Sequence, residues 1–136
     1  MGEALSHIAG AGNVKVREYI RLVQEVIRTA PHVISFEIAF EEIDQWECYI
    51  RGKLQIDGGL ELHIAEYVIT GPTLKRTKYR YHLQGAEGKM LVRWDNAPHH
   101  PQVATFPHHR HESDGDVKES LAMDVEAVLQ AVTAYI

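Results

Sequence analysis

From His32 to about Asn96 the sequence alternates between apolar and polar residues, and this period of two limits the possible folds more than any other feature. Successive side chains of a strand point to opposite faces, so the alternation predicts strands with one apolar and one polar face. Turn sequences at residues 57–59 (Asp-Gly-Gly), 71–72 (Gly-Pro) and 85–88 help to divide the region into five strands. Five strands in series with short turns predict an antiparallel meander.

Two amphipathic segments flank the predicted sheet. Apolar residues recur at helical spacing over residues 14–29, where Asn13 can cap the helix and Pro31 ends it. A second helix is predicted from Asp116, with a glutamate three residues on as in a capping box and with Leu121 on its apolar face. If both helices cover the apolar sheet face, the fold is α+β: N-terminal helix, five-stranded antiparallel meander, His/Pro-rich loop and C-terminal helix in a two-layer sandwich.

The length of 136 residues is that of one domain, so we expect a single α+β domain over residues 13–136 and a flexible lead-in over residues 1–12. There is no run of about 18 apolar residues that would predict a membrane span. The N-terminus also lacks the basic and apolar regions of a secretory signal. The single cysteine, Cys48, cannot form an internal disulfide and falls on the apolar side of its strand. These features predict a cytoplasmic protein with a buried, inert thiol.

Histidine is the unusual component of the sequence. Five of the nine histidines lie between residues 99 and 111, inside a proline-containing segment, residues 97–116, that has no periodicity. A long aperiodic segment in a compact domain is more often functional than filler. Imidazoles exchange protons near neutral pH and bind transition metals, and Asp95 could orient one of them or ligate a metal. The spacing matches no standard zinc motif, so proton transfer is the first interpretation, and a surface loop without function is the alternative.

A basic strand crosses the predicted sheet although the formal net charge of the chain is −5. By alternation, Lys78, Arg80 and His82 share the polar face, and Arg51 and Arg93 extend this set to other strands. A basic strip on an open sheet face would contact phosphates. In the alternative interpretation it is a solvated face whose cations pair with acidic residues across the sheet.

Glu66 falls on an apolar stripe of the predicted sheet, in phase with Ile64 and Val68. A carboxylate in such a position costs free energy unless it is paired. It could face the histidine segment or a cation, with a shifted pKa that suits acid–base chemistry. Alternatively, the strand ends or bulges there and Glu66 reaches solvent.

Three stretches of the sequence resemble the TumE family, whose members are toxins of bacterial and archaeal toxin–antitoxin pairs. These stretches are residues 60–67 (LELHIAEY), residues 78–82 (KYRYH) and residues 93–111, where RWDNAPHHP is followed by FPHHRH. The resemblance covers about residues 15–135 and implies a toxin with a cognate helix-turn-helix antitoxin. By motif position it carries over Glu66, Tyr79, Tyr81, His82, Arg93, Asp95, Asn96, His99, His100, His108, His109 and His111.

Because many small toxins of such pairs cleave RNA, the resemblance also favours a metal-independent ribonuclease that needs no cofactor. We expect His109 and His111 to be its acid and base, with Asp95 as the orienting carboxylate. The alternatives are a non-catalytic module that binds a protein or nucleic acid and, more weakly, a histidine-rich metal site; an exposed sheet edge would also permit a homodimer. The predicted catalytic residues are Glu66, Asp95, His100, His108, His109 and His111, and the predicted substrate-binding residues are Arg51, Lys78, Arg80, His82 and Arg93.

Overall fold

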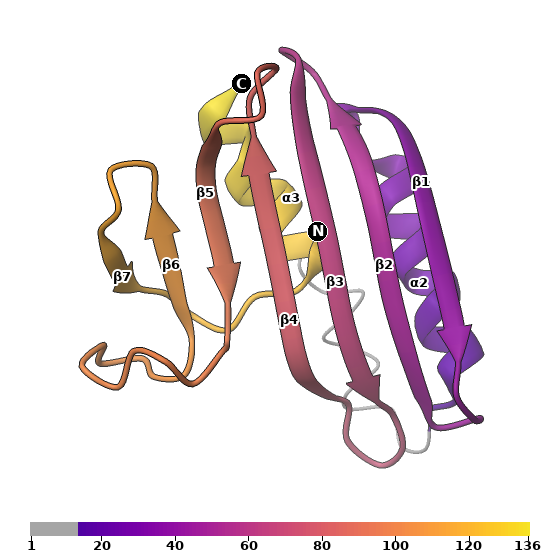
Figure 1. Cartoon of the computed structure of the whole chain (residues 1–136). Coiled ribbons are helices and arrows are strands. Elements are labelled where there is room, and N and C mark those ends of the chain that lie inside the picture. Colours follow the sequence, from indigo (N-terminus) through magenta and orange to yellow (C-terminus); the bar gives the residue numbers. More distant parts are fainter. Residues whose placement is uncertain (1–13) are drawn as a thin grey trace.

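A computed structural model describes residues 14–136, which form one antiparallel sheet with helices on one of its faces (Figure 1). The strands are hydrogen-bonded in chain order from β1 to β7, as a meander requires. The predicted meander is confirmed, but the predicted number of five strands is wrong because the sheet has seven. The strands are β1 (Val33–Glu42), β2 (Glu47–Ile56), β3 (Leu60–Ile69), β4 (Lys75–Gln84), β5 (Met90–Asp95), β6 (His109–Glu112) and β7 (Val117–Glu119).

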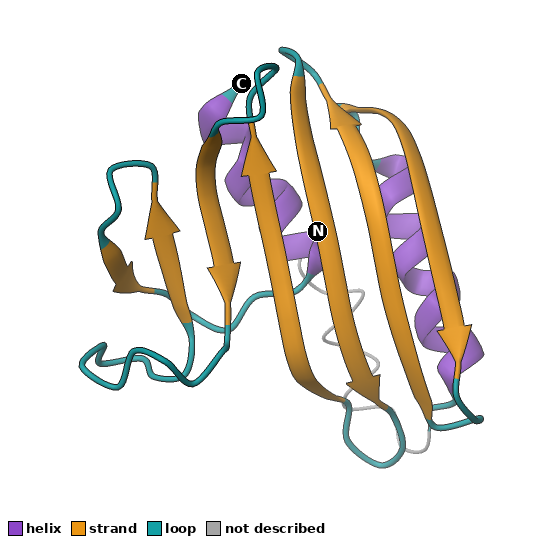
Figure 2. Ribbon diagram, in the orientation of Figure 1, coloured by secondary structure: helices purple, strands orange, loops and turns teal. Residues whose placement is uncertain are grey.

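The two helices lie behind the same sheet face, α2 (Val16–Thr29) behind β1 and β2 and α3 (Val125–Val132) toward β4 and β5 (Figure 2). A short 3₁₀ helix, η1 (Thr133–Tyr135), follows α3. Helix α2 ends where predicted, because Ala30 before Pro31 is extended. The predicted lead-in of residues 1–12 and the predicted Asn13 cap lie outside the described residues.

The end of the chain differs from the prediction. Asp116 does not cap a helix: it closes a hairpin in which its backbone carbonyl accepts a hydrogen bond from the Glu112 N–H at 2.8 Å. Gly115 has a φ of 96°, which favours glycine and lets the chain turn back here instead of entering the predicted helix. Helix α3 begins only after Asp124, whose carboxylate accepts from the Ala127 N–H at 2.8 Å. Leu121 precedes this helix and is exposed.

The core lies between the helices and the apolar sheet face. Along β3 every second residue from Leu60 to Val68 is buried, and the intervening side chains are half-buried on the other face. Val23 and Ile27 of α2 and Val128 of α3 close this core from the helix side. Because the helices cover only one face, the other face of the sheet is left to polar side chains. No helix within residues 14–136 is both long enough and apolar enough to span a membrane.

The reactivity of Cys48 tests this burial. The thiol belongs to the core, and burial, followed by the nearby Glu66 charge, raises its pKa to about 12. At pH 8 roughly one thiol in 10⁴ is then ionised, and thiolate is the reactive form. We expect iodoacetamide to alkylate Cys48 far more slowly in the native protein than in urea, as measured by mass spectrometry. Equal rates in the two states would contradict the burial.

Candidate functional site

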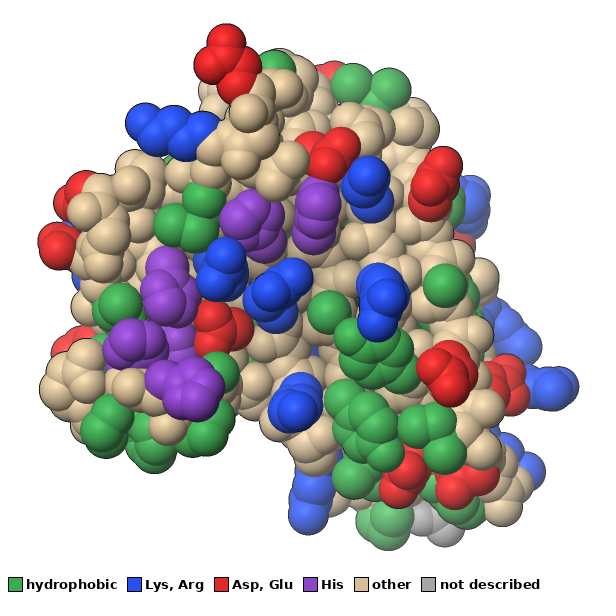
Figure 3. Space-filling model, viewed as in Figure 1, with side chains coloured by type: hydrophobic (Ala, Val, Ile, Leu, Met, Phe, Trp, Pro, Cys, Tyr) green, Lys and Arg blue, Asp and Glu red, His purple; other side chains and the backbone are tan. Residues whose placement is uncertain are grey.

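Two rows of polar side chains cross the face of the sheet that the helices leave open. The β-sheet register places one row at Arg51, Ala65, Arg80, Asp95 and His109. The adjacent row, two residues along each strand, contains Lys53, His63, His82, Arg93 and His111. Figure 3 views this face, with histidines gathered at the left and cationic side chains beside them. Pairing of β5 with β6 therefore brings two clustered histidines beside Asp95 and Arg93.

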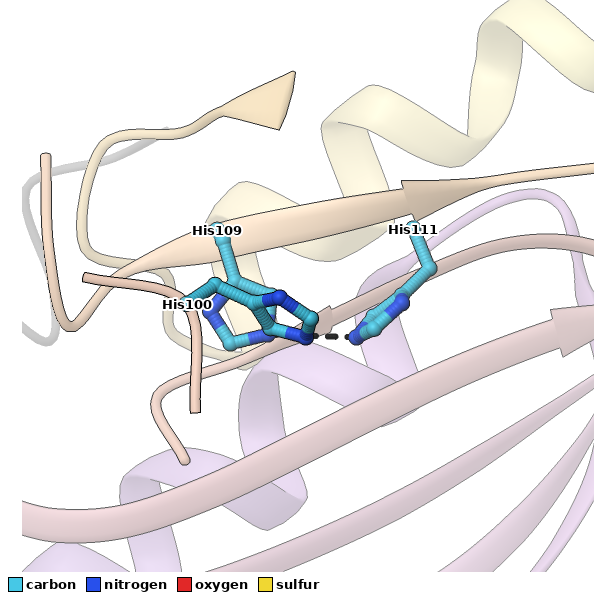
Figure 4. A group of neighbouring side chains, drawn as sticks. All are labelled: His100, His109 and His111. Carbon is cyan, nitrogen blue, oxygen red and sulfur yellow. Dashed lines mark hydrogen bonds between the residues drawn. The ribbon is translucent and has the colours of Figure 1, made fainter. Parts of the chain in front are cut away.

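The Asp95 carboxylate lies between two imidazoles. Its Oδ1 is 2.9 Å from Nε2 of His109, and its Oδ2 is 3.3 Å from Nε2 of His111. These two ring nitrogens are themselves 3.1 Å apart, as the dashed line in Figure 4 marks. His100, from the loop between β5 and β6, brings a third ring, whose centroid lies 4.8 Å from that of His109 and 5.4 Å from that of His111. We call Asp95, His100, His109 and His111 the histidine–aspartate cluster.

The members of the cluster differ in their contact with solvent. The side chain of His109 is 1% exposed and that of Asp95 is 10% exposed, whereas that of His111 is 23% exposed. Burial lowers the pKa of His111, and the Asp95 charge only partly opposes this effect. His111 therefore favours its neutral form at pH 7, with a free lone pair on one ring nitrogen.

One ring nitrogen of His109 has a fixed role. Its Nδ1 lies 2.8 Å from the backbone carbonyl oxygen of Pro107. A carbonyl oxygen only accepts, so Nδ1 carries the hydrogen and donates it. In the neutral ring the lone pair is then on Nε2, which points to Asp95 and His111. A hydrogen bond from one ring nitrogen to a carbonyl in this way fixes the tautomer of a functional histidine.

Other predicted site residues lie outside the cluster. The ring of His108 faces Tyr79, whose hydroxyl is 2.7 Å from Nδ1 of His108, and Tyr79 belongs to the helix-covered face. The side chain of Asn96 binds the Tyr79 N–H and the Thr77 carbonyl, which ties the end of β5 to β4. His99 is exposed. Adjacent residues of the segment thus point in different directions, and only part of the histidine-rich motif converges.

Glu66 is also apart from the cluster, on the opposite face of the sheet. It is 1% exposed and accepts hydrogen bonds from the hydroxyls of Tyr19 and Tyr81. Nε of Arg76 lies 3.2 Å from its Oε2. Burial, then the Glu66 charge, raises the pKa of both tyrosines. Burial lowers the pKa of Arg76, but the Glu66 charge and the two tyrosines together more than offset it and raise this pKa. Glu66 therefore neither bulges out to solvent nor faces the clustered histidines: a cation and two hydroxyls hold it under α2.

Four basic residues of the open face have no acidic partners among the described residues. Arg51, Lys78, Arg80 and Arg93 form no ion pair with any carboxylate of residues 14–136, so the alternative of a charge-paired face does not hold for them. Nε of Arg93 instead contacts Nδ1 of His82 at 3.3 Å. Burial and this arginine lower the pKa of His82. The arginine and lysine heads are thus available to an anionic ligand.

The fold and the site define a small α+β protein with an open, partly basic sheet face and a histidine–aspartate cluster at one end of it. Residues 23–136 match the family described as Toxin TumE. The chain therefore belongs to the TumE family of toxins. Membership of a toxin family implies, in general, an antitoxin partner. Searches of curated proteins and of solved structures gave no match.

The hydrogen bonds and ion pair of Glu66 predict that this residue stabilises the fold. Glu66→Ala leaves the Arg76 charge and two tyrosine hydroxyls buried without their partner, so we expect a loss of about 3–5 kcal/mol in the free energy of unfolding. Urea denaturation measures this loss. The control is Glu37→Ala on the exposed surface of β1, which should change stability by less than about 0.5 kcal/mol. A Glu66 variant as stable as the wild type would mean that the network contributes nothing to the fold.

Proposed function

We propose that this toxin cleaves RNA on the open sheet face, with the histidine–aspartate cluster as its reaction centre. The observation that carries the proposal is the position of the cluster beside cations that no carboxylate neutralises. Proton-transferring groups and anion-binding groups then share one accessible face. RNA cleavage through the 2′-hydroxyl needs both kinds of group.

The chemistry assigns a role to each type of residue. The 2′-oxygen attacks the neighbouring phosphorus, its proton passes to a base, the bond from phosphorus to the 5′-oxygen breaks, and an acid protonates that oxygen. His111 is the accessible member of the cluster and can meet the substrate, whereas His109 is buried and acts as a positioning residue. His100, next to both rings, is the second group within reach for proton transfer. Arg80 and Arg93 would neutralise the phosphate charge.

The same face favours a single-stranded substrate. Tyr49 and Tyr67 are directly opposite each other on β2 and β3, and Lys78 is opposite Tyr67 on β4. Aromatic rings on an open sheet stack with unpaired bases, and cations between them follow the backbone. A strand of RNA crossing from these tyrosines past Arg80 would reach the cluster.

The antitoxin and the location of the protein complete the proposal. A helix-turn-helix antitoxin fits the predicted pairing, and its contact with the open face would block the route to the cluster. A cytoplasmic location follows from an RNA target. A homodimer would form through β1 or β7, the two edge strands of the sheet.

A binding role without chemistry is the second candidate, because the same unpaired cations would hold a nucleic acid without cleaving it. Growth arrest that survives loss of the cluster would favour this role.

Cleavage itself is tested by two substitutions. Asp95→Asn and His111→Asn should each lower the rate of RNA cleavage by at least about 100-fold and relieve growth arrest, since positioned acid–base groups contribute 10²–10⁴-fold. The matched control is His63→Asn, a histidine of the same sheet face that lies in the row of His111 but three strands away on β3. It should cleave at close to the wild-type rate. Undiminished cleavage by both cluster variants would contradict the proposal.

Substrate binding is tested separately with a non-cleavable 2′-O-methyl oligonucleotide. Arg80→Ala and Arg93→Ala should weaken binding, and each should reduce the salt slope by about 0.7 for one lost phosphate contact to a single strand. Fluorescence anisotropy over a range of salt concentrations measures both quantities. Arg21→Ala, an exposed arginine of α2 on the other side of the molecule, is the control and should leave both unchanged. Equal losses at Arg21 would indicate non-specific attraction.

A further inference from the structure

The donor atoms of the histidine–aspartate cluster face one another at short distances. His109 donates from Nδ1 to the Pro107 carbonyl, so in the neutral ring Nε2 presents a lone pair to Oδ1 of Asp95 at 2.9 Å. Two acceptors at this distance repel each other, and either a proton or a metal ion between them removes the repulsion. A hydrogen on Nε2 of His111 could bond to His109 or to Asp95 but not to both. An added cation would satisfy all of these lone pairs at once.

The spacing of the donors matches a transition-metal ion. Zinc binds histidine nitrogen at about 2.0–2.1 Å, which separates tetrahedral donors by about 3.3 Å. The observed separations are 2.9 Å between Nε2 of His109 and Oδ1 of Asp95, 3.1 Å between the Nε2 atoms of His109 and His111, and 3.3 Å between Nε2 of His111 and the other carboxylate oxygen, Oδ2, of Asp95. One nitrogen of His100 lies within 4.8 Å of nitrogens of both other rings. His100 comes from a loop, so it can approach as the last ligand.

We propose that Asp95, His100, His109 and His111 bind one divalent transition-metal ion, of which zinc is the best match. Three imidazoles and one carboxylate form a nitrogen- and oxygen-donor set of the kind that zinc takes in proteins. Nδ1 of His109 already donates to the Pro107 carbonyl, and a hydrogen bond of this kind orients metal-binding histidines. The ligands come from β5, the following loop and β6, so the ion would clamp the loop to the sheet.

The metal site shares residues with the proposed reaction centre, but it does not rest on RNA cleavage. Binding of an ion is measured on the protein alone. If all four residues bind the ion, the lone pairs of His100 and His111 are occupied, so neither ring can accept the 2′-hydroxyl proton. Metal-loaded protein should therefore cleave RNA more slowly than metal-free protein. The proposed acid–base mechanism requires that cleavage persists in EDTA.

The experiment uses the full chain with any purification tag removed and zinc as the probe. Isothermal titration should give one equivalent of zinc per chain, and Co²⁺ should give the visible absorption of a tetrahedral site. His111→Asn and Asp95→Asn should each weaken zinc binding by more than about 100-fold, because loss of an outer-shell partner alone costs 10–100-fold. Zinc should raise the Tm of the wild type and leave that of these variants unchanged.

Two histidines serve as matched controls. His63→Asn removes an imidazole from the same face, and His108→Asn removes the neighbour of His109 that faces Tyr79 instead. Both should bind zinc as the wild type does. Absence of stoichiometric binding, or equal binding by His111→Asn, would overturn the metal site even if RNA is cleaved. Binding that depends on the cluster, in a protein that cleaves no RNA either with zinc or in EDTA, would support the metal site and refute the ribonuclease.

Discussion

One-sided burial of the sheet is the constraint on which the rest of this structure depends. Two helices cover one face, so each strand beneath them must place apolar side chains inward at every second position. The side chains between these apolar residues then all point to the face without helices, whether they are polar, charged or aromatic. A shift of one residue in the register would exchange the two faces, so the packing of the core also determines which polar side chains meet on the open face.

The functional consequence appears where β5 pairs with β6. Strand β5 is anchored on the core side by Val92 and Trp94, and this anchoring sends Arg93 and Asp95 to the open face. Strand β6 has no such apolar stripe, but its pairing to β5 sets His109 and His111 against them. The cluster is therefore positioned by a strand that the core holds in place. The loop between β5 and β6 adds His100.

Prediction from the sequence succeeded where one face of an element is buried, because apolar residues then recur at regular spacing. Alternation predicted the first five strands and the shared face of Arg51, Lys78 and Arg80, and helical spacing predicted α2. It failed for β6 and β7, because these short strands carry almost no apolar residues and so show no period. The Asp-Gly sequence before Asp116 is a hairpin signal, and it prevailed over the capping pattern that starts at Asp116. The direction of each imidazole depends on β6, so separating His108 from His109 required the structure.

Two buried carboxylates lie on opposite faces of this sheet, and their surroundings explain why only one of them suggests chemistry. Glu66 meets a cation and two hydroxyl donors, so its negative charge is compensated within the fold and nothing further is needed. Asp95 meets the Ala97 N–H and two imidazoles, and the Nδ1 hydrogen of one of them, His109, is already donated to the Pro107 carbonyl. Glu66 is thus closed off by the fold, whereas Asp95 lies beside His111, a ring that solvent reaches. The row that contains His111 also contains Arg93, a cation without an ion pair to any described carboxylate, so proton-transferring and anion-binding groups meet at Asp95 and not at Glu66.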